Sequence, residues 1–334
     1  MKIEDTIFAD YTKFFLAICG PTGAGKTDFS YQLAEKFPIE IINCDVGQFY
    51  EPLSIGTAKP DWKSSSIPHH LFDVVKEPRN FTVTEYRSLV HKTMEDIWQR
   101  KALPVLVGGS MFYLRALFFP ADQSAGGDAS VASNDAHEKV FSAEEKLKMW
   151  HELYEIDPDR AIKIDKHDGY RLQRALHIWR ASGVKPSLHK PVYQPLSRFH
   201  ITFITRDRDE LYQRIDERVL AMMEQGWPAE VEALSDEWRS FLMSKKLLGY
   251  PELIDMIERH VSDQERAHVY AQIQKKTRNY AKRQITFWRS LKEALDEQTG
   301  PTTRCEELNL TLSSVDLYLN HIQHVVDAEI KGLR

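Results

Sequence analysis

The chain has few of the features that mark secreted or membrane-embedded proteins. It contains only three cysteines, Cys19, Cys44 and Cys305, and their spacing indicates neither a zinc site nor a disulfide framework. The apolar run Phe14–Cys19 has six residues, which is too short for a signal-peptide core or a membrane span. We therefore expect a cytoplasmic protein with no membrane partner, and we expect it to be a monomer.

A positive net charge is also lacking. Lys and Arg number 44 against 49 Asp and Glu, so the formal net charge of the 334 residues is −5. Taken alone, this balance argues against a protein that coats nucleic acid non-specifically. Hydrophobic residues make up 42% of the chain and charged residues 28%, which excludes a wholly disordered or collagen-like chain. The length suggests two domains, or one core with a large insertion.

Short apolar runs alternate with helical patterns in the first third of the chain. Residues 14–19 form a continuous apolar run, typical of a strand buried on both faces of a parallel sheet, and residues 39–44 and 103–107 are two more apolar runs of strand length. Residues 28–36 and 84–101 have the spacing of amphipathic helices. This order predicts an α/β fold with ligands at the carboxyl ends of the strands.

The remainder of the chain is mainly helical in pattern. Residues 122–136 are rich in Gly, Ala and Ser and are typical of a linker. Helices are predicted within residues 143–182 and at residues 210–225, 229–243 and 268–289, with a returning strand at 199–204. We predict a core at residues 1–120, a small all-helical insertion at 121–196, and completion of the core with C-terminal helices at 197–334.

A phosphate-binding motif follows the first apolar run. It matches the pattern G-x-x-x-x-G-K-[ST] and consists of Gly20, Pro21, Thr22, Gly23, Ala24, Gly25, Lys26 and Thr27. The backbone N–H groups would point at an anion, Lys26 would add a positive charge, and the Thr27 hydroxyl could bind Mg²⁺. The motif predicts a phosphate site without identifying the phosphorylated molecule.

A carboxylate follows the second apolar run. A nucleotide-hydrolysing enzyme usually has an Asp for the metal at the end of a further strand, but residues 103–107 are followed by Gly108, Gly109 and Ser110. Asp45 instead lies where it could act on a substrate beside the phosphate, as in small-molecule kinases. The structural alternative is an Asp that caps a loop or helix.

Basic residues gather in two places. Residues 272–289 carry six cations and no acid, interleaved with Tyr280, Phe287 and Trp288. As one helix they could contact several phosphates, or they could form a solvated face above core-packed aromatics. A second cluster, Arg171, Arg174 and Arg180, lies in the predicted insertion.

Two further pairs of residues have simple interpretations. Arg214 and Arg218 lie four apart on a predicted helix and would share a face, where Asp216 and Glu217 could balance them. For the adjacent His69 and His70, we favour hydrogen bonding within a loop over a metal site, because neighbouring side chains of an extended chain face opposite ways.

In their order along the chain, these stretches resemble the bacterial tRNA dimethylallyltransferase family, also called tRNA isopentenyltransferases. The likeness runs from about residue 14 to about residue 290. The matching segments are the phosphate loop, Asp45 with Gln48 and Tyr50, and residues 54–60, 69–73, 107–114, 171–176, 211–218, 248–250 and 277–289. The resemblance implies a P-loop NTPase-like core, a parallel sheet flanked by helices, with an inserted small all-helical domain.

The resemblance also implies a reaction and its residues. The family transfers a dimethylallyl group from dimethylallyl diphosphate to N6 of the adenosine 3′ of the anticodon, position 37, in tRNAs that read codons beginning with U. By motif position, Asp45 would be the general base, Thr22 would lie at the diphosphate, and Arg218 would support the leaving group, with Mg²⁺ as cofactor. The expected tRNA-binding residues are Asp45, Val46, Gly47, Gln48, Ser110, Tyr170, Arg171, Leu172, Gln173, Arg174, Lys246, Leu247, Leu248, Gly249, Tyr250, Lys275, Lys276, Arg278, Lys282 and Arg283.

Two departures from the family pattern leave alternatives open. Val46 stands where the family has Ser, followed by Gly47, and Ser110 stands where Thr is usual. A P-loop kinase would consume ATP without prenyl transfer, and a catalytically idle relative would bind tRNA only. An enzyme that prenylates free adenine nucleotides would need neither the insertion nor the basic segment.

Overall fold

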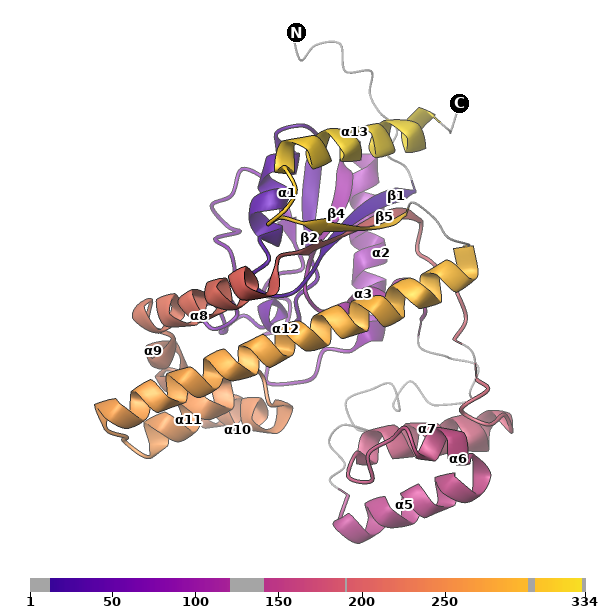
Figure 1. Ribbon diagram of the computed structural model, residues 1–334, viewed down its shortest axis with the longest axis vertical. Coiled ribbons are helices and arrows are strands. Elements are labelled where there is room, and N and C mark those ends of the chain that lie inside the picture. The colour runs from indigo at the N-terminus through magenta and orange to yellow at the C-terminus, as the bar shows by residue number, and fades with distance from the viewer. Residues whose placement is uncertain (1–12, 121–140, 190, 300–303, 332–334) are drawn as a thin grey trace. The chain divides into compact units, whose positions relative to one another are not determined.

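The computed structural model describes residues 13–120, 141–189, 191–299 and 304–331 (Figure 1). The chain divides into two compact units. The first consists of Met1–Arg79, Ser88–Arg115 and Leu196–Arg334, and the second of Asn80–Arg87 with Ala116–Pro195. The predicted linker at residues 122–136 lies outside the described residues, and the predicted domain boundaries stay predictions.

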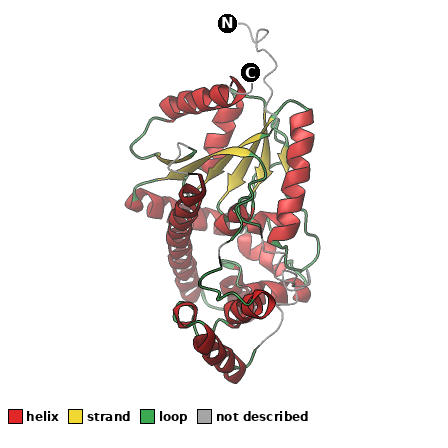
Figure 2. Ribbon diagram, turned by 90° about the vertical axis from the view of Figure 1, so that its right-hand side faces the viewer, coloured by secondary structure: helices red, strands yellow, loops and turns green. Residues whose placement is uncertain are grey.

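A parallel sheet lies at the centre of the first unit. Its six strands are β1 (Phe14–Cys19), β2 (Ile39–Asn43), β3 (His69–His70), β4 (Leu103–Gly108), β5 (Arg198–Thr205) and β6 (Cys305–Asn309), in the order β3-β2-β4-β1-β5-β6. Every pair is parallel. All residues of β1 and β2 are buried, which is why β1 is continuously apolar and β2 is apolar except for the buried Glu40 and Asn43. Figure 2 shows helices on both sides of the sheet, so the predicted fold class is confirmed.

The helices follow the predicted positions in part. They are α1 (Lys26–Ala34), the 3₁₀ helix η2 (Val46–Phe49), α2 (Val83–Gln99), α3 (Met111–Ala116), α5 (Ala143–Ile156), α6 (Pro158–Ala161), α7 (Gly169–Ser182), α8 (Arg208–Glu224), α9 (Trp227–Glu232), α10 (Asp236–Lys245), α11 (Tyr250–Glu258), α12 (Asp263–Thr299) and α13 (Val315–Lys331). The single helix predicted at residues 229–243 is wrong. Two helices form there because Ser235 begins α10, where its side chain accepts a hydrogen bond from the Trp238 N–H (3.4 Å).

The long helix α12 carries the basic segment and packs against α8 (Figure 1). It has 37 residues, so it extends beyond both ends of the predicted helix. Trp288 on α12 is fully buried and stacks on Phe203 of β5, with ring centroids 4.8 Å apart. One aromatic of the basic segment therefore anchors the helix to the sheet.

The second unit is helical where it is described after residue 140. Helices α5, α6 and α7 enclose an apolar core of Leu153, Ala161, Ile164, Leu172, Ala175 and Leu176. Ser142 and Glu145 form a capping box that begins α5. The helical pattern predicted within residues 143–182 is confirmed, and it consists of three helices.

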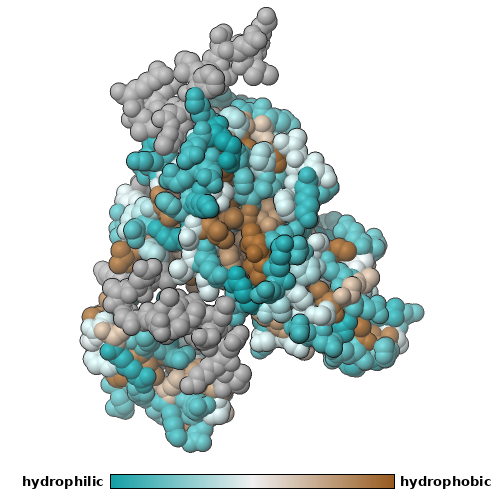
Figure 3. All heavy atoms as spheres, turned by 180° about the vertical axis from the view of Figure 1, so that it is seen from behind, coloured by the Kyte–Doolittle hydropathy of each residue, from teal (hydrophilic) through white to brown (hydrophobic). Residues whose placement is uncertain are grey.

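The surface in Figure 3 is mostly hydrophilic, with an apolar area near the middle of the face. Among the described residues, no helix combines the length and apolar character needed to cross a membrane.

Candidate functional site

The phosphate loop connects β1 to α1 at the carboxyl edge of the sheet. Gly25 is the N-cap of α1 with φ +99°, a backbone conformation that side chains rarely allow, so the motif requires glycine there. The Lys26 Nζ donates a hydrogen bond to the Pro21 carbonyl oxygen (2.9 Å), which folds the lysine back over the loop. The loop thus combines a helix N-terminus with a cation, as an anion site requires.

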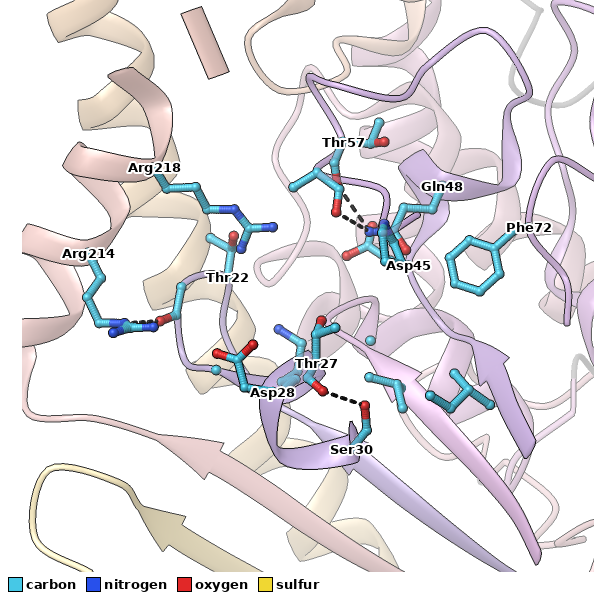
Figure 4. A pocket seen from close by; sticks show the side chains of 18 of the residues that line it. Thr22, Thr27, Asp28, Ser30, Asp45, Gln48, Thr57, Phe72, Arg214 and Arg218 are labelled. Atoms are coloured by element: carbon cyan, nitrogen blue, oxygen red, sulfur yellow. Dashed lines mark hydrogen bonds between the residues drawn. The ribbon is translucent and has the colours of Figure 1, made fainter. Parts of the chain in front are cut away.

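A cavity of about 490 Å³ lies beside this loop. Figure 4 shows Arg214 and Arg218 extending from α8 on one side, and Asp45 and Gln48 on another. Thr22, Asp45 and Arg218, the three residues predicted to be catalytic, all line the cavity. Segments that are far apart in the sequence therefore meet at one place.

Burial changes the ionisation of the charged groups around the cavity. It lowers the pKa of Lys26 to about 8, although the Asp45 carboxylate acts in the opposite direction. It raises the pKa of Asp45, against the opposing influence of Lys26 and Arg218. A carboxylate with a raised pKa is a stronger base, and two cations face it. The cavity can accept a proton and hold an anion at the same time.

Asp45 is fixed by the turn that follows β2. Its N–H donates to the Asn43 Oδ1 (2.9 Å), and its own Oδ1 accepts from the Gly47 N–H (3.3 Å). The next residue, Val46, donates its N–H to the Ser110 Oγ (2.9 Å). Asp45 therefore has the capping role proposed as its alternative, and the same residue also lines the cavity.

Gln284 on α12 connects the phosphate loop to β4, and sequence reasoning missed it. Its side chain is 4% exposed. The Oε1 accepts from the Thr22 N–H (3.0 Å), and the Nε2 donates to the Gly109 carbonyl oxygen (2.8 Å). A Cβ on Gly109 would lie 2.3 Å from that Nε2, so a larger residue there would displace the amide. Residues 277–289 belong to the family resemblance, but nothing in their sequence indicates this contact.

Glu230 on α9 is a second missed residue. One carboxylate accepts hydrogen bonds from the backbone N–H groups of Ser54 (2.8 Å), Ile55 (2.6 Å) and Gly56 (3.2 Å). It also accepts from the Tyr250 hydroxyl (2.9 Å). These bonds fix the loop at residues 54–60, whose Thr57 and Ala58 carbonyls in turn accept from Gln48.

The residues expected to bind tRNA lie in several environments. Lys246 is exposed in the turn before α11, whereas the Tyr250 side chain is fully buried. Ser110 is buried, and its hydroxyl hydrogen-bonds within the protein. In the second unit, Arg171 is exposed on α7 and Leu172 belongs to the helical core. Tyr170, Gln173 and Arg174 also lie on α7, and Leu247, Leu248 and Gly249 lie between α10 and α11. Direct RNA contact by all of these residues stays a prediction.

The basic segment of α12 is partly neutralised by other elements. Lys276 forms an ion pair with Glu252 of α11, and Arg278 forms one with Asp216 of α8. The segment has no acid of its own, but acids far away in the sequence pair with two of its six cations, so its charge is partly compensated.

The two adjacent histidines form local hydrogen bonds. The His69 Nδ1 contacts the Ile67 carbonyl oxygen (2.7 Å), and the His70 Nε2 contacts the Glu40 carboxylate (2.7 Å). In the part of the chain that the structure describes, no group of three or more His, Cys, Asp or Glu is placed to hold a metal ion. The two hydrogen bonds confirm the hydrogen-bonding role, but the histidines form strand β3 and not a loop, and the partner of His70 lies on strand β2.

Comparison with known proteins identifies the family. The family model described as IPP transferase matches residues 48–291. A tRNA dimethylallyltransferase of Bacillus cereus (strain AH820) is 34% identical over 307 residues, covering 89% of this chain and 95% of that protein. The crystal structure of the full-length tRNA isopentenylpyrophosphate transferase of Bacillus halodurans is 28% identical, with a TM-score of 0.64 and coverage of 96% and 98%. A eukaryotic dimethylallyltransferase acting on tRNA is 26% identical, with a TM-score of 0.73 and coverage of 96% and 80%.

Proposed function

The chain belongs to the IPP transferase family and is a tRNA dimethylallyltransferase, and we propose the donor, the acceptor and the residue roles of its reaction. The donor is dimethylallyl diphosphate. The acceptor is N6 of the adenosine at position 37, immediately 3′ of the anticodon, in tRNAs that read codons beginning with U. The observation that supports this most directly is the meeting of a phosphate loop and a partly buried carboxylate in one cavity.

Asp45 is the proposed general base. The lone pair of an adenine amino group is delocalised into the ring, so N6 is a poor nucleophile until its proton can leave. A positioned carboxylate that takes this proton contributes about 10²–10⁴-fold to the rate. Burial raises the pKa of Asp45, which improves it as a proton acceptor near neutral pH. The new bond forms between N6 and the prenyl carbon as the bond from that carbon to the diphosphate oxygen breaks.

The leaving diphosphate would lie against the phosphate loop. Lys26, Arg218 and the loop N–H groups are placed around the same cavity and would stabilise the charge that develops on it. Thr22 lines the cavity as well, and its N–H is held by Gln284. The apolar lining residues Ile41 and Phe72 offer contact to the prenyl carbons.

Mg²⁺ fits the oxygen groups at the start of α1. Thr27 and Asp28 are exposed there, and Figure 4 shows both side chains at the cavity. Mg²⁺ is usually held by few protein oxygens together with substrate phosphates and water. We propose the Thr27 hydroxyl as its protein ligand, and the bound ion would supply positive charge to the diphosphate.

The tRNA would be held by exposed cations of α7 and α12. Arg171 and Arg174 are exposed on α7, and Lys275 is exposed on α12. The target adenosine must leave its base stack to reach the cavity. This unstacking costs a few kcal/mol, and it costs less in a single-stranded loop. A cytoplasmic location and a monomeric state stay predictions.

Transfer of label tests the donor and the acceptor together. The protein is incubated with unmodified tRNA, Mg²⁺ and labelled dimethylallyl diphosphate, and the label is located by nucleoside mass analysis. We expect the label on the adenosine at position 37 only. Label on free AMP but not on tRNA, or ATP hydrolysis without any transfer, would contradict the proposal.

A further inference from the structure

A second cavity, of about 410 Å³, lies between α8 and α12 and shares no lining residue with the first. Besides Arg206, which pairs with Glu210, three cations line it: Arg208 at the start of α8, and Lys282 and Arg289 on α12. All three are exposed, and none forms an ion pair within the described ranges of the chain. The cavity therefore presents positive charge to solvent.

Acids close to this cavity already have partners. Glu307, which lines it, accepts a hydrogen bond from the Trp288 Nε1 (2.8 Å). Glu210 pairs with Arg206, and Asp216 pairs with Arg278. None of these carboxylates is paired with the three exposed cations. An anionic ligand would therefore meet cations that have no competing salt bridge.

The cavity also offers an aromatic ring. Tyr212 of α8 lines it and is half-buried. The Arg208 Cζ lies 5.2 Å from the centre of this ring and the Lys282 Nζ lies 5.8 Å from it. Phe203 and Ile285 add apolar lining. A stacking surface beside cations matches the chemistry of one nucleotide, with a base for the ring and a phosphate for the charges.

We propose that this second cavity binds one nucleotide of the tRNA strand outside the reaction site, with the base at Tyr212 and the phosphate among Arg208, Lys282 and Arg289. The inference rests on the proposed function. An RNA strand suits the site better than a free nucleotide because the cations are exposed. The cavity also continues the row of basic residues along α12 that is expected to follow the tRNA.

Salt dependence of tRNA binding tests the phosphate contact. The double variant Arg208→Gln/Arg289→Gln is compared with Lys13→Gln/Lys92→Gln, which removes two exposed cations elsewhere in the same unit. We expect the slope of log K against log salt to fall in magnitude by about 0.7–0.9 in the first variant, because one phosphate contact contributes roughly that amount. The slope of the control should stay within error of the wild type. Equal slopes in both variants and the wild type would overturn the phosphate contact.

Substitution of the ring tests the base contact. Tyr212→Leu should weaken tRNA binding roughly tenfold at constant salt, and Tyr212→Phe should restore it, because stacking needs the ring and not the hydroxyl. Tyr212→Leu with wild-type affinity would overturn the base contact. AMP is titrated in parallel. If Arg208→Gln/Arg289→Gln abolished AMP binding but left the salt slope of tRNA binding unchanged, the cavity would be assigned to a free nucleotide instead. A wild-type protein that bound no tRNA would contradict the proposed function itself.

Discussion

Removal of the Gln284 side-chain amide should damage donor binding more than tRNA binding. The amide joins the Thr22 N–H to the Gly109 carbonyl oxygen and is almost fully buried. In Gln284→Leu both groups lose their partner, and an unsatisfied buried polar group costs about 1–3 kcal/mol. Water from the cavity can replace the bond to Thr22, which leaves the Gly109 carbonyl unsatisfied, so we expect a total of about 1–3 kcal/mol, divided between stability and the geometry of the loop.

Gln284→Glu separates the loop geometry from general instability. The ionised carboxylate can still accept from the Thr22 N–H, but it has no proton to donate to Gly109. We expect the KM for the prenyl donor to rise about 10–100-fold at pH 8, which corresponds to about 1.4–2.8 kcal/mol. As the pH falls, the buried carboxyl becomes protonated and can donate again, so the KM should recover towards that of the wild type.

Steady-state kinetics with each substrate varied in turn measure this effect. Gln272→Glu, on the exposed side of the same helix, serves as the matched control. If Gln284→Glu had the same KM for the donor as the control at every pH, the contact would have no role in holding the phosphate loop.

Three further predictions follow from buried charges. Burial lowers the pKa of Lys26 to about 8, so kcat/KM for the donor should fall as the pH rises through about 8. Lys26→Arg should not show this fall, because arginine stays protonated. A wild-type kcat/KM that is constant up to pH 9 would contradict this prediction. Glu230→Gln should lower the free energy of unfolding, measured by denaturant titration, by about 1–3 kcal/mol. The reason is that three backbone N–H groups lose a charged acceptor. An unchanged free energy of unfolding would mean that water replaces the carboxylate. Burial also lowers the pKa of His200 to about 4, so the unfolded state binds one more proton than the folded state between about pH 6.5 and 4. The free energy of unfolding should therefore decrease as the pH is lowered across that range, by roughly 3 kcal/mol at most. The decrease should be smaller in His200→Leu.

The sequence predicted the central strands well because burial on both faces leaves a simple signal. The strands β1 and β4 are continuous apolar runs, and β2 is largely apolar apart from Glu40 and Asn43. The edge strand β6 reads C-E-E-L-N and has exposed or half-buried positions, so no comparable pattern predicts it. The two-residue strand β3 is too short for any periodicity to appear.

The site was predictable where one local motif carries the chemistry. The phosphate loop and Asp45 could be found because each follows a recognisable strand. Gln284 and Glu230 could not be found in this way, because the backbone groups that they bind lie 174 or more positions away in the chain. The ion pair of Arg278 with Asp216 was missed for the same reason, since charge patterning along one helix does not include acids on its neighbours.

Prenyl transfer by Asp45→Asn tests the account most directly. The variant keeps the size of the side chain but removes the proposed proton acceptor. Single-turnover transfer from labelled dimethylallyl diphosphate is measured at saturating tRNA and donor, together with tRNA affinity. We predict a rate about 10²–10⁴-fold below that of the wild type, with tRNA still bound. A wild-type rate in Asp45→Asn would contradict the assignment of Asp45 as the base.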